Sequence, residues 1–163
     1  MKKYLIFTTL FFFSIGVFAC TCGKIKDMNG KFPGFATISR LAQTTLLVQI
    51  TDKKENGIGI LIKNSYGAPT SLKELFIKNM NPGYTCSDST TNFKIGEYYL
   101  IVIFEDDNNQ KKIKLSACFE SYINVTTKST RAIITDQINP KPKIWTREQL
   151  ENKLGIDITS SLN

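Results

Sequence analysis

Residues 97–118 read EYYLIVIFEDDNNQKKIKLSAC and contain the clearest hairpin pattern of the chain. The first part, residues 97–104, is almost continuously apolar and aromatic, which is typical of a buried strand. The acidic and amide side chains of residues 105–110 favour a turn. Residues 111–118 then return with an apolar side chain at every second position, at Ile113, Leu115 and Ala117. The stretch therefore predicts two antiparallel strands, the second of which ends at Cys118.

A second hairpin is predicted earlier in the chain. Residues 45–51 (TLLVQIT) and 58–63 (IGILIK) each carry apolar side chains at alternate positions, and the charged residues 52–57 between them form a turn. Residues 71–80 (SLKELFIKNM) fit both helical and strand spacing, and we interpret them as a strand.

Helical signals lie on either side of these strands. Residues 35–43 predict one or two helical turns. Near the C-terminus, Thr146-Arg147-Glu148-Gln149 has the form of a capping box, so it opens a helix that runs to Leu154 and stops at Gly155. Trp145, just before the box, is expected to pack this helix onto the strands. About five strands and a terminal helix in one domain predict an all-β fold with short helices, a small Greek-key barrel or sandwich.

The composition excludes many functional classes. The chain has 163 residues, 42% hydrophobic and 21% charged, which is typical of a single globular domain. Histidine is absent, which excludes Ser-His-Asp and Cys-His catalytic centres and HExxH zinc sites. Because no convincing carboxylate pair is present either, we expect neither an enzyme nor a cofactor or metal of its own. Lys and Arg number 21 against 14 Asp and Glu, but they are scattered, so no nucleic-acid partner is expected.

The first residues have the form of a secretory signal peptide. A positive start (MKK) precedes an apolar run (YLIFTTLFFF), and Val17-Phe18-Ala19 supplies small residues at the third-last and last positions before a cut at Cys20. We therefore expect residues 1–19 to be removed and residues 20–163 to form one domain, secreted or periplasmic.

The four cysteines, Cys20, Cys22, Cys86 and Cys118, all lie in the predicted exported part. An even number of cysteines in an oxidising compartment predicts two disulfides. A bridge between Cys20 and Cys22 would close a very small, strained ring, so each of them is expected to pair with a distant cysteine, in either of the two ways that remain. A metal-thiolate cluster is disfavoured because the sequence lacks a CxxC pair.

Cleavage after Ala19 would make Cys20 the first residue of the exported chain. Its free α-amine and its carbonyl oxygen could then close a chelate ring on a metal ion. Such an amine titrates near pH 7.7 to 8.0, so a useful fraction is a neutral donor at neutral pH. A disulfide from Cys20 would fix that amine in space.

The motif Cys20-Thr21-Cys22 after a signal peptide, followed by single cysteines at positions 86 and 118, resembles the N-terminal domain of the tissue inhibitors of metalloproteinases, within the netrin-like module. The resemblance covers roughly residues 20–125, and the cysteine spacing is its specific part. It implies a five-stranded OB-fold barrel of netrin-like type and the disulfides Cys20–Cys86 and Cys22–Cys118. The compact signal and the content of Lys and Asn indicate a bacterial member.

The resemblance also implies a function, that of a secreted inhibitor of zinc metalloendopeptidases. Cys20 would bind the zinc of the target enzyme through its amine and carbonyl, displacing the water needed for attack. Thr21 would enter the specificity pocket of the target. Cys22 would lock the inhibitory ridge, formed by Cys20, Thr21 and Cys22, to the barrel, and Gly83-Tyr84-Thr85 would lie alongside this ridge and complete the contact edge. The sequence departs from the family at Gly23 and Lys24, where a small or branched residue and then a proline are common.

An alternative use of the same cysteine remains open. Val17-Phe18-Ala19-Cys20 partly matches a bacterial lipobox, in which the cysteine is lipidated and its amine acylated. The protein would then be a non-inhibitory netrin-like binding module of the cell envelope, attached to a membrane through Cys20, and acylation would abolish zinc chelation. Against this, Phe18 is large for the middle of a lipobox.

Overall fold

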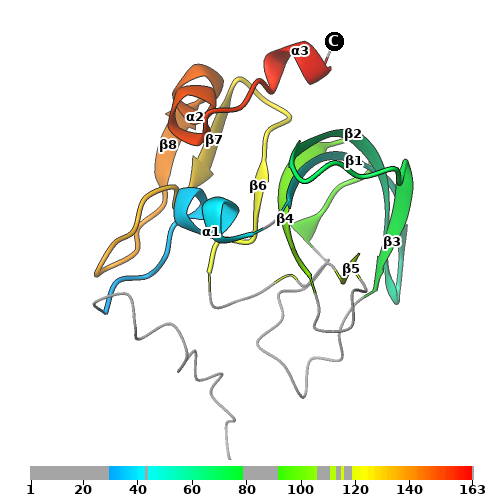
Figure 1. Ribbon diagram of the computed structural model, residues 1–163, viewed down its shortest axis with the longest axis horizontal. Coiled ribbons are helices and arrows are strands. Elements are labelled where there is room, and N and C mark those ends of the chain that lie inside the picture. Colours follow the sequence, from blue (N-terminus) through cyan, green and yellow to red (C-terminus); the bar gives the residue numbers. More distant parts are fainter. Residues whose placement is uncertain are drawn as a thin grey trace, which may run out of the picture.

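The computed structural model describes residues 30–42, 44–78, 92–105, 111–112, 115 and 119–162. Within them an antiparallel sheet has the strand order β3-β2-β1-β4-β5, and β6 also pairs with β4 (Figure 1). Its strands are β1 (Thr44–Lys54), β2 (Gly57–Gly67), β3 (Glu74–Lys78), β4 (Tyr98–Glu105), β5 (Lys111–Lys112) and β6 (Tyr122–Asn124). A separate two-stranded sheet joins β7 (Ser129–Ala132) to β8 (Lys143–Thr146), and the helices are α1 (Phe35–Leu41), α2 (Arg147–Leu154) and α3 (Thr159–Leu162).

The hairpin predicted in residues 45–63 is confirmed as β1 and β2. The two strands pair antiparallel with Ile50 opposite Ile60 and Val48 opposite Ile62. The register shifts twice along the pair, once after Leu47 and once after Ile50. Such irregularities bend a strand and increase its twist. Figure 1 shows the result, a strongly curled sheet at β1, β2 and β3.

The strand predicted in residues 71–80 is confirmed as β3, and the one in residues 97–104 as β4. The structure describes only part of the predicted return, namely β5, which pairs Lys111 and Lys112 with the end of β4. Three further short strands, β6, β7 and β8, lie in residues 119–146, where no strand was predicted.

Strands β1 and β4 are buried on both faces, so the sheet separates two apolar cores. One, the strand-side core, fills the inside of the curled sheet. It includes Phe93, Leu115 and alternating residues of the strands: Leu46, Val48, Ile50, Ile58, Ile60, Ile77, Tyr99, Ile101 and Ile103. The other, the helix-side core, lies against the opposite face of β1 and β4 under the helices: Phe35, Ala36, Ile38, Ala42, Leu47, Leu100, Val102, Ile123, Val125, Ala132, Ile134, Leu150 and Ile158.

The helix predicted in residues 35–43 is confirmed as α1, and its start is tied to the C-terminal half of the chain. Phe32 pairs with Gln137 by backbone hydrogen bonds in both directions, of 2.7 and 3.0 Å. The backbone N–H of Gly34, the residue before the helix, donates to Asp136 Oδ1 at 2.9 Å. These bonds tie the start of α1 to the segment that contains Asp136 and Gln137.

The C-terminal helix α2 is confirmed with the predicted caps. The Gln149 N–H donates to Thr146 Oγ1 at 3.2 Å and the Thr146 N–H donates to Gln149 Oε1 at 3.0 Å, which is a capping box. Gly155 ends the helix in a left-handed conformation with φ 69°. Trp145 packs against the helix-side core as expected, and its Nε1–H donates to the Ala132 carbonyl at 3.3 Å.

The residues after α2 pack back onto β2. The Tyr66 hydroxyl donates to the Asp157 carbonyl at 2.6 Å, and Asn64 Nδ2 donates to Ser161 Oγ at 2.8 Å. Ile158 is fully buried in the helix-side core. The end of the described chain therefore lies against the second half of β2.

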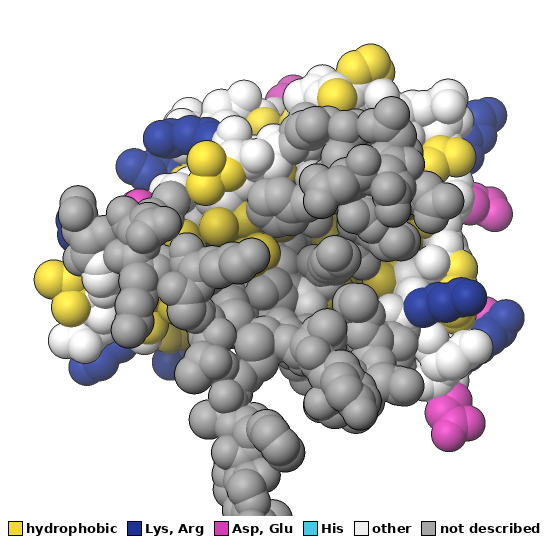
Figure 2. Space-filling view, turned by 60° about the horizontal axis from the view of Figure 1, so that its bottom comes forward, with side chains coloured by type: hydrophobic (Ala, Val, Ile, Leu, Met, Phe, Trp, Pro, Cys, Tyr) yellow, Lys and Arg dark blue, Asp and Glu magenta, His cyan; other side chains and the backbone are white. Residues whose placement is uncertain are grey.

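The charged surface agrees with the scattered lysines of the sequence. On the face drawn in Figure 2, the Lys and Arg side chains of the described residues lie apart around the rim. Among the described residues, none of the helices has both the length and the apolar character that crossing a membrane requires.

Candidate functional site

The residues that the sequence analysis assigned to the inhibitory ridge and its disulfides lie outside the described residues. They are Cys20, Thr21, Cys22, Gly83, Tyr84, Thr85, Cys86 and Cys118. Their functions and pairings therefore stay predictions.

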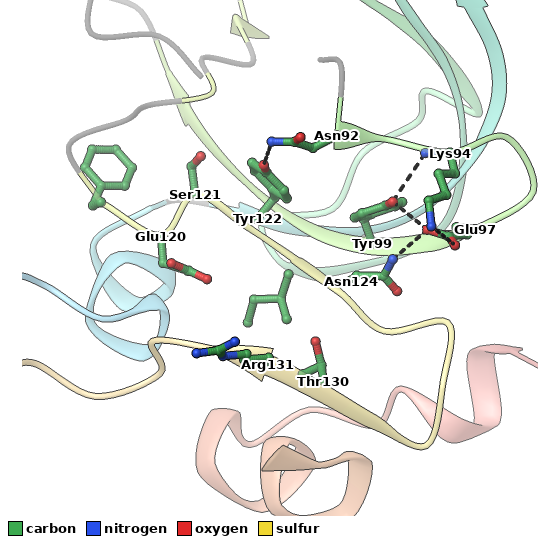
Figure 3. A pocket seen from close by; sticks show the side chains of 12 residues that line it. Asn92, Lys94, Glu97, Tyr99, Glu120, Ser121, Tyr122, Asn124, Thr130 and Arg131 are labelled. Carbon is green, nitrogen blue, oxygen red and sulfur yellow. Dashed lines mark hydrogen bonds and ion pairs between the residues drawn. The ribbon is translucent and has the colours of Figure 1, made fainter. Parts of the chain in front are cut away.

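A different site is visible in the described part of the chain, a pocket of about 320 Å³ along β6 that we call the β6 pocket (Figure 3). One side is formed by the segment that leads into β4 together with side chains of β6, and the other by Thr130 and Arg131 of β7. The β6 pocket exists because Tyr99 of β4 pairs with Asn124 of β6. That pairing brings together segments that are remote in sequence.

The most ordered part of the β6 pocket is a hydrogen-bonded group around Glu97, which we call the Glu97 network. Glu97 Oε2 accepts hydrogen bonds from the Tyr99 hydroxyl and from Asn124 Nδ2, both at 2.7 Å. Lys94 Nζ lies 3.6 Å from Glu97 Oε1, and the Lys94 backbone N–H donates to the Tyr99 hydroxyl oxygen at 3.3 Å. The carboxylate is thus held from three directions (Figure 3).

These contacts shift two pKa values in opposite directions. The hydrogen bond from Tyr99, opposed by partial burial and aided by Asn124 and Lys94, lowers the pKa of Glu97 below its ordinary 4.5. Burial and the nearby Glu97 carboxylate raise the pKa of Tyr99 to about 12. At neutral pH the carboxylate is therefore ionised and the phenol protonated, which is the pairing that the hydrogen bond requires.

An aromatic cluster supports the network from the core. The ring of Phe93, which is fully buried, lies 4.7 Å from that of Tyr99 and 4.6 Å from that of Tyr122, measured between centroids. These tilted arrangements are favourable for aromatic pairs. Asn92 Nδ2 donates to the Tyr122 hydroxyl at 3.4 Å. The wall of the β6 pocket is consequently rigid around Tyr99 and Tyr122.

The network gives a testable pH dependence, because Tyr99 keeps its proton in the folded state up to a pH of about 12. The unfolded chain releases that proton near pH 10, so the contribution of Tyr99 to stability is present below pH 10 and is lost as pH rises toward 12. Two pKa units correspond to roughly 2 to 3 kcal/mol. In the variant Tyr99→Phe, the free energy of unfolding should fall less between pH 9 and pH 12 than in the wild type, as measured by urea unfolding.

The control for this prediction is Tyr98→Phe, which removes the neighbouring hydroxyl and should keep the wild-type loss. An alkaline loss in Tyr99→Phe as steep as in the wild type would contradict the assignment.

The tripeptide Asn124-Val125-Thr126 matches a glycosylation sequon, but its side chains are used inside the fold. Asn124 Nδ2 donates to Glu97, and Asn124 Oδ1 accepts from the Thr126 N–H at 2.9 Å. Thr126 Oγ1 accepts from the Tyr98 N–H at 2.8 Å. These contacts join β6 to the start of β4, which gives the tripeptide a structural function.

Within the described ranges, no group of three or more Asp, Glu, Cys or His side chains could hold a metal ion. No family model, curated protein or solved structure matches this chain.

Proposed function

We propose that the exported chain inhibits zinc metalloendopeptidases by placing the amine and carbonyl of Cys20 on the target's catalytic zinc. The observation that carries the proposal is the motif Cys20-Thr21-Cys22 directly after the predicted signal peptide. An N-terminal cysteine offers two donor atoms in one residue, and an inhibitor that occupies the zinc also removes the bound water that serves as the nucleophile.

The proposal requires a rigid base for the ridge. The proposed disulfides Cys20–Cys86 and Cys22–Cys118 would supply it by joining the N-terminus to chain positions before and after β4 in the sequence. Preorganisation of this kind strengthens binding because less conformational freedom is lost in the complex. Thr21 then fills the specificity pocket, and Gly83-Tyr84-Thr85 extends the contact edge.

The fold compatible with this function is a five-stranded OB-type barrel. The strand order β3-β2-β1-β4-β5 and the curl of the first three strands support it. The barrel closes when β5 meets β3, the two ends of that order.

The test adds one alanine before Cys20. In that variant Cys20 has an amide in place of the amine, so the chelate is lost while the fold is kept. We expect the inhibition constant against a matrix metalloproteinase catalytic domain to rise on the order of 100-fold or more, which corresponds to about 2.7 kcal/mol. The matched control adds the alanine after Asn163, and it should inhibit like the parent chain. Equal inhibition by both variants would disprove the mechanism.

The intact mass of the protein from its native host decides whether the amine is free. A mass for residues 20–163, reduced by four hydrogens, supports the inhibitor. A diacylglycerol or N-acyl increment would instead support the lipoprotein alternative and end the chelation hypothesis.

A further inference from the structure

We infer that the β6 pocket binds a small neutral saccharide. The inference concerns residues far along the chain from Cys20 and does not depend on the inhibitory function. The volume of the β6 pocket is about 320 Å³, at the lower end of the range of small-molecule sites, which is about 300 to 1,000 Å³. The pocket therefore suits a ligand of one or two rings.

The charges that line the β6 pocket favour a neutral ligand. Lys94 and Arg131 contribute two cationic groups, and Glu97 and Glu120 contribute two carboxylates. A ligand with a net charge would be attracted by one pair and repelled by the other. A ligand with several hydroxyl groups can use both, because each hydroxyl is at once a donor and an acceptor.

The Glu97 network provides a fixed acceptor on one side of the pocket. Tyr99 and Asn124 both bond to Glu97 Oε2, and Lys94 lies next to the other oxygen. Because the pKa of Glu97 is lowered, its carboxylate is ionised at neutral pH, where it accepts the hydrogen bonds of the network. A preformed acceptor of this kind orients a hydroxyl without further ordering of the protein. The ring of Tyr122, held by the aromatic cluster, adds an apolar surface beside it.

The β7 side of the pocket provides donors. Arg131 is exposed and, among the described residues, its guanidinium has no hydrogen-bond or ion-pair partner. Its backbone is nevertheless fixed, because Arg131 pairs with Ile144 and Thr130 pairs with Trp145 of β8. A guanidinium presents its N–H groups in a planar fork, which can bond to two adjacent hydroxyls of a sugar ring. Thr130 adds a hydroxyl that can donate or accept.

The test titrates the isotope-labelled exported chain with glucose, galactose, mannose and N-acetylglucosamine and with their disaccharides, followed by amide NMR shifts. We expect saturable shifts with at least one of these sugars, confined to residues 92–99, 120–124 and 130–131. The absence of saturable shifts with every sugar, or saturable binding there of acetate or glycine in place of the sugars, would overturn the inference.

A pair of variants then locates the binding. Arg131→Gln should raise the dissociation constant at least tenfold, whereas Arg40→Gln, which makes the same change at an exposed arginine of α1, should leave it unchanged. Thr130→Val is a second variant in the pocket and should also weaken binding. The amide spectra report whether each variant is folded, and wild-type affinity in both pocket variants would overturn the assignment.

Discussion

Gly57→Ala should strongly destabilise the protein, although it adds only one methyl group at a turn. Gly57 is the first residue of β2 and has φ 153°, a backbone conformation that residues with a side chain rarely adopt. A Cβ at this position would lie inside van der Waals contact of the Ile77 carbonyl oxygen and 2.9 Å from Phe76 Cε1. Relief requires β2 and β3 to separate, because Ile77 belongs to the strand that pairs with this end of β2.

The cost combines backbone strain with a collision against backbone, and we expect about 3 kcal/mol or more. For a chain of this size that lowers the midpoint of thermal unfolding by about 6 to 12 °C, measured by circular dichroism. Gly96→Ala is the matched control. Gly96 also has a positive φ, 84°, but no described atom lies within 4 Å of the added Cβ, so the cost should be about 1 kcal/mol. Equal destabilisation by the two variants would contradict the steric explanation.

Phe35→Ala should have the largest effect among the changes in the helix-side core. Phe35 begins α1 and is completely buried against the face of the sheet that carries Leu47 and Leu100. Removal of a buried phenylalanine ring costs about 3 to 5 kcal/mol, because the contacts of the ring are lost and a cavity remains. Urea unfolding at neutral pH should show this loss, together with a midpoint of thermal unfolding lowered by about 6 to 20 °C.

The control for this change lies on the same helix. Leu41 is 61% exposed, so Leu41→Ala removes a comparable apolar side chain without opening the core. It should change the free energy of unfolding by less than about 0.5 kcal/mol. If Leu41→Ala were as destabilising as Phe35→Ala, the core would not lie where it is described.

The hairpins could be predicted because their signals are local. In β1 and β2 the apolar residues recur at every second position, and the charged turn between them marks the reversal. The caps of α2 were equally readable, since Thr146 and Gln149 stand at the fixed spacing of a capping box. In each case the residues that decide the structure are close neighbours in the sequence.

Burial on both faces was predictable for β4, whose apolar run is nearly continuous, but not for β1, where alternation indicated a single buried face. Leu46, Val48 and Ile50 indicated one buried face, and Leu47 next to them also proves to be buried, on the other side of the sheet. The sequence of the strand itself contains no signal that α1 and the C-terminal residues cover that second face. Strands β6, β7 and β8 were missed for the same reason, since segments of three or four residues form through pairing with distant strands and show no period of their own.

The β6 pocket was missed in a similar way. Glu97 and Tyr99 stand two positions apart on a predicted strand, so the sequence could have placed them on one face. Their partner Asn124 lies 27 positions beyond Glu97, and it arrives there only through the pairing of β6 with β4. The ridge of Cys20 to Cys22 was the reverse case, a strong sequence motif that lies outside the described residues.

The double-sided burial of β1 and β4 also bears on how this protein can diverge. Each residue from Leu46 to Val48 and from Tyr99 to Ile103 serves one of two cores, so neither face of these strands is open to drift. The outward side of β3, where Phe76 is 40% exposed, has no such restriction. Descendants of this sequence would therefore keep a conserved central pair of strands while their outer surface, including any recognition sites on it, changed independently.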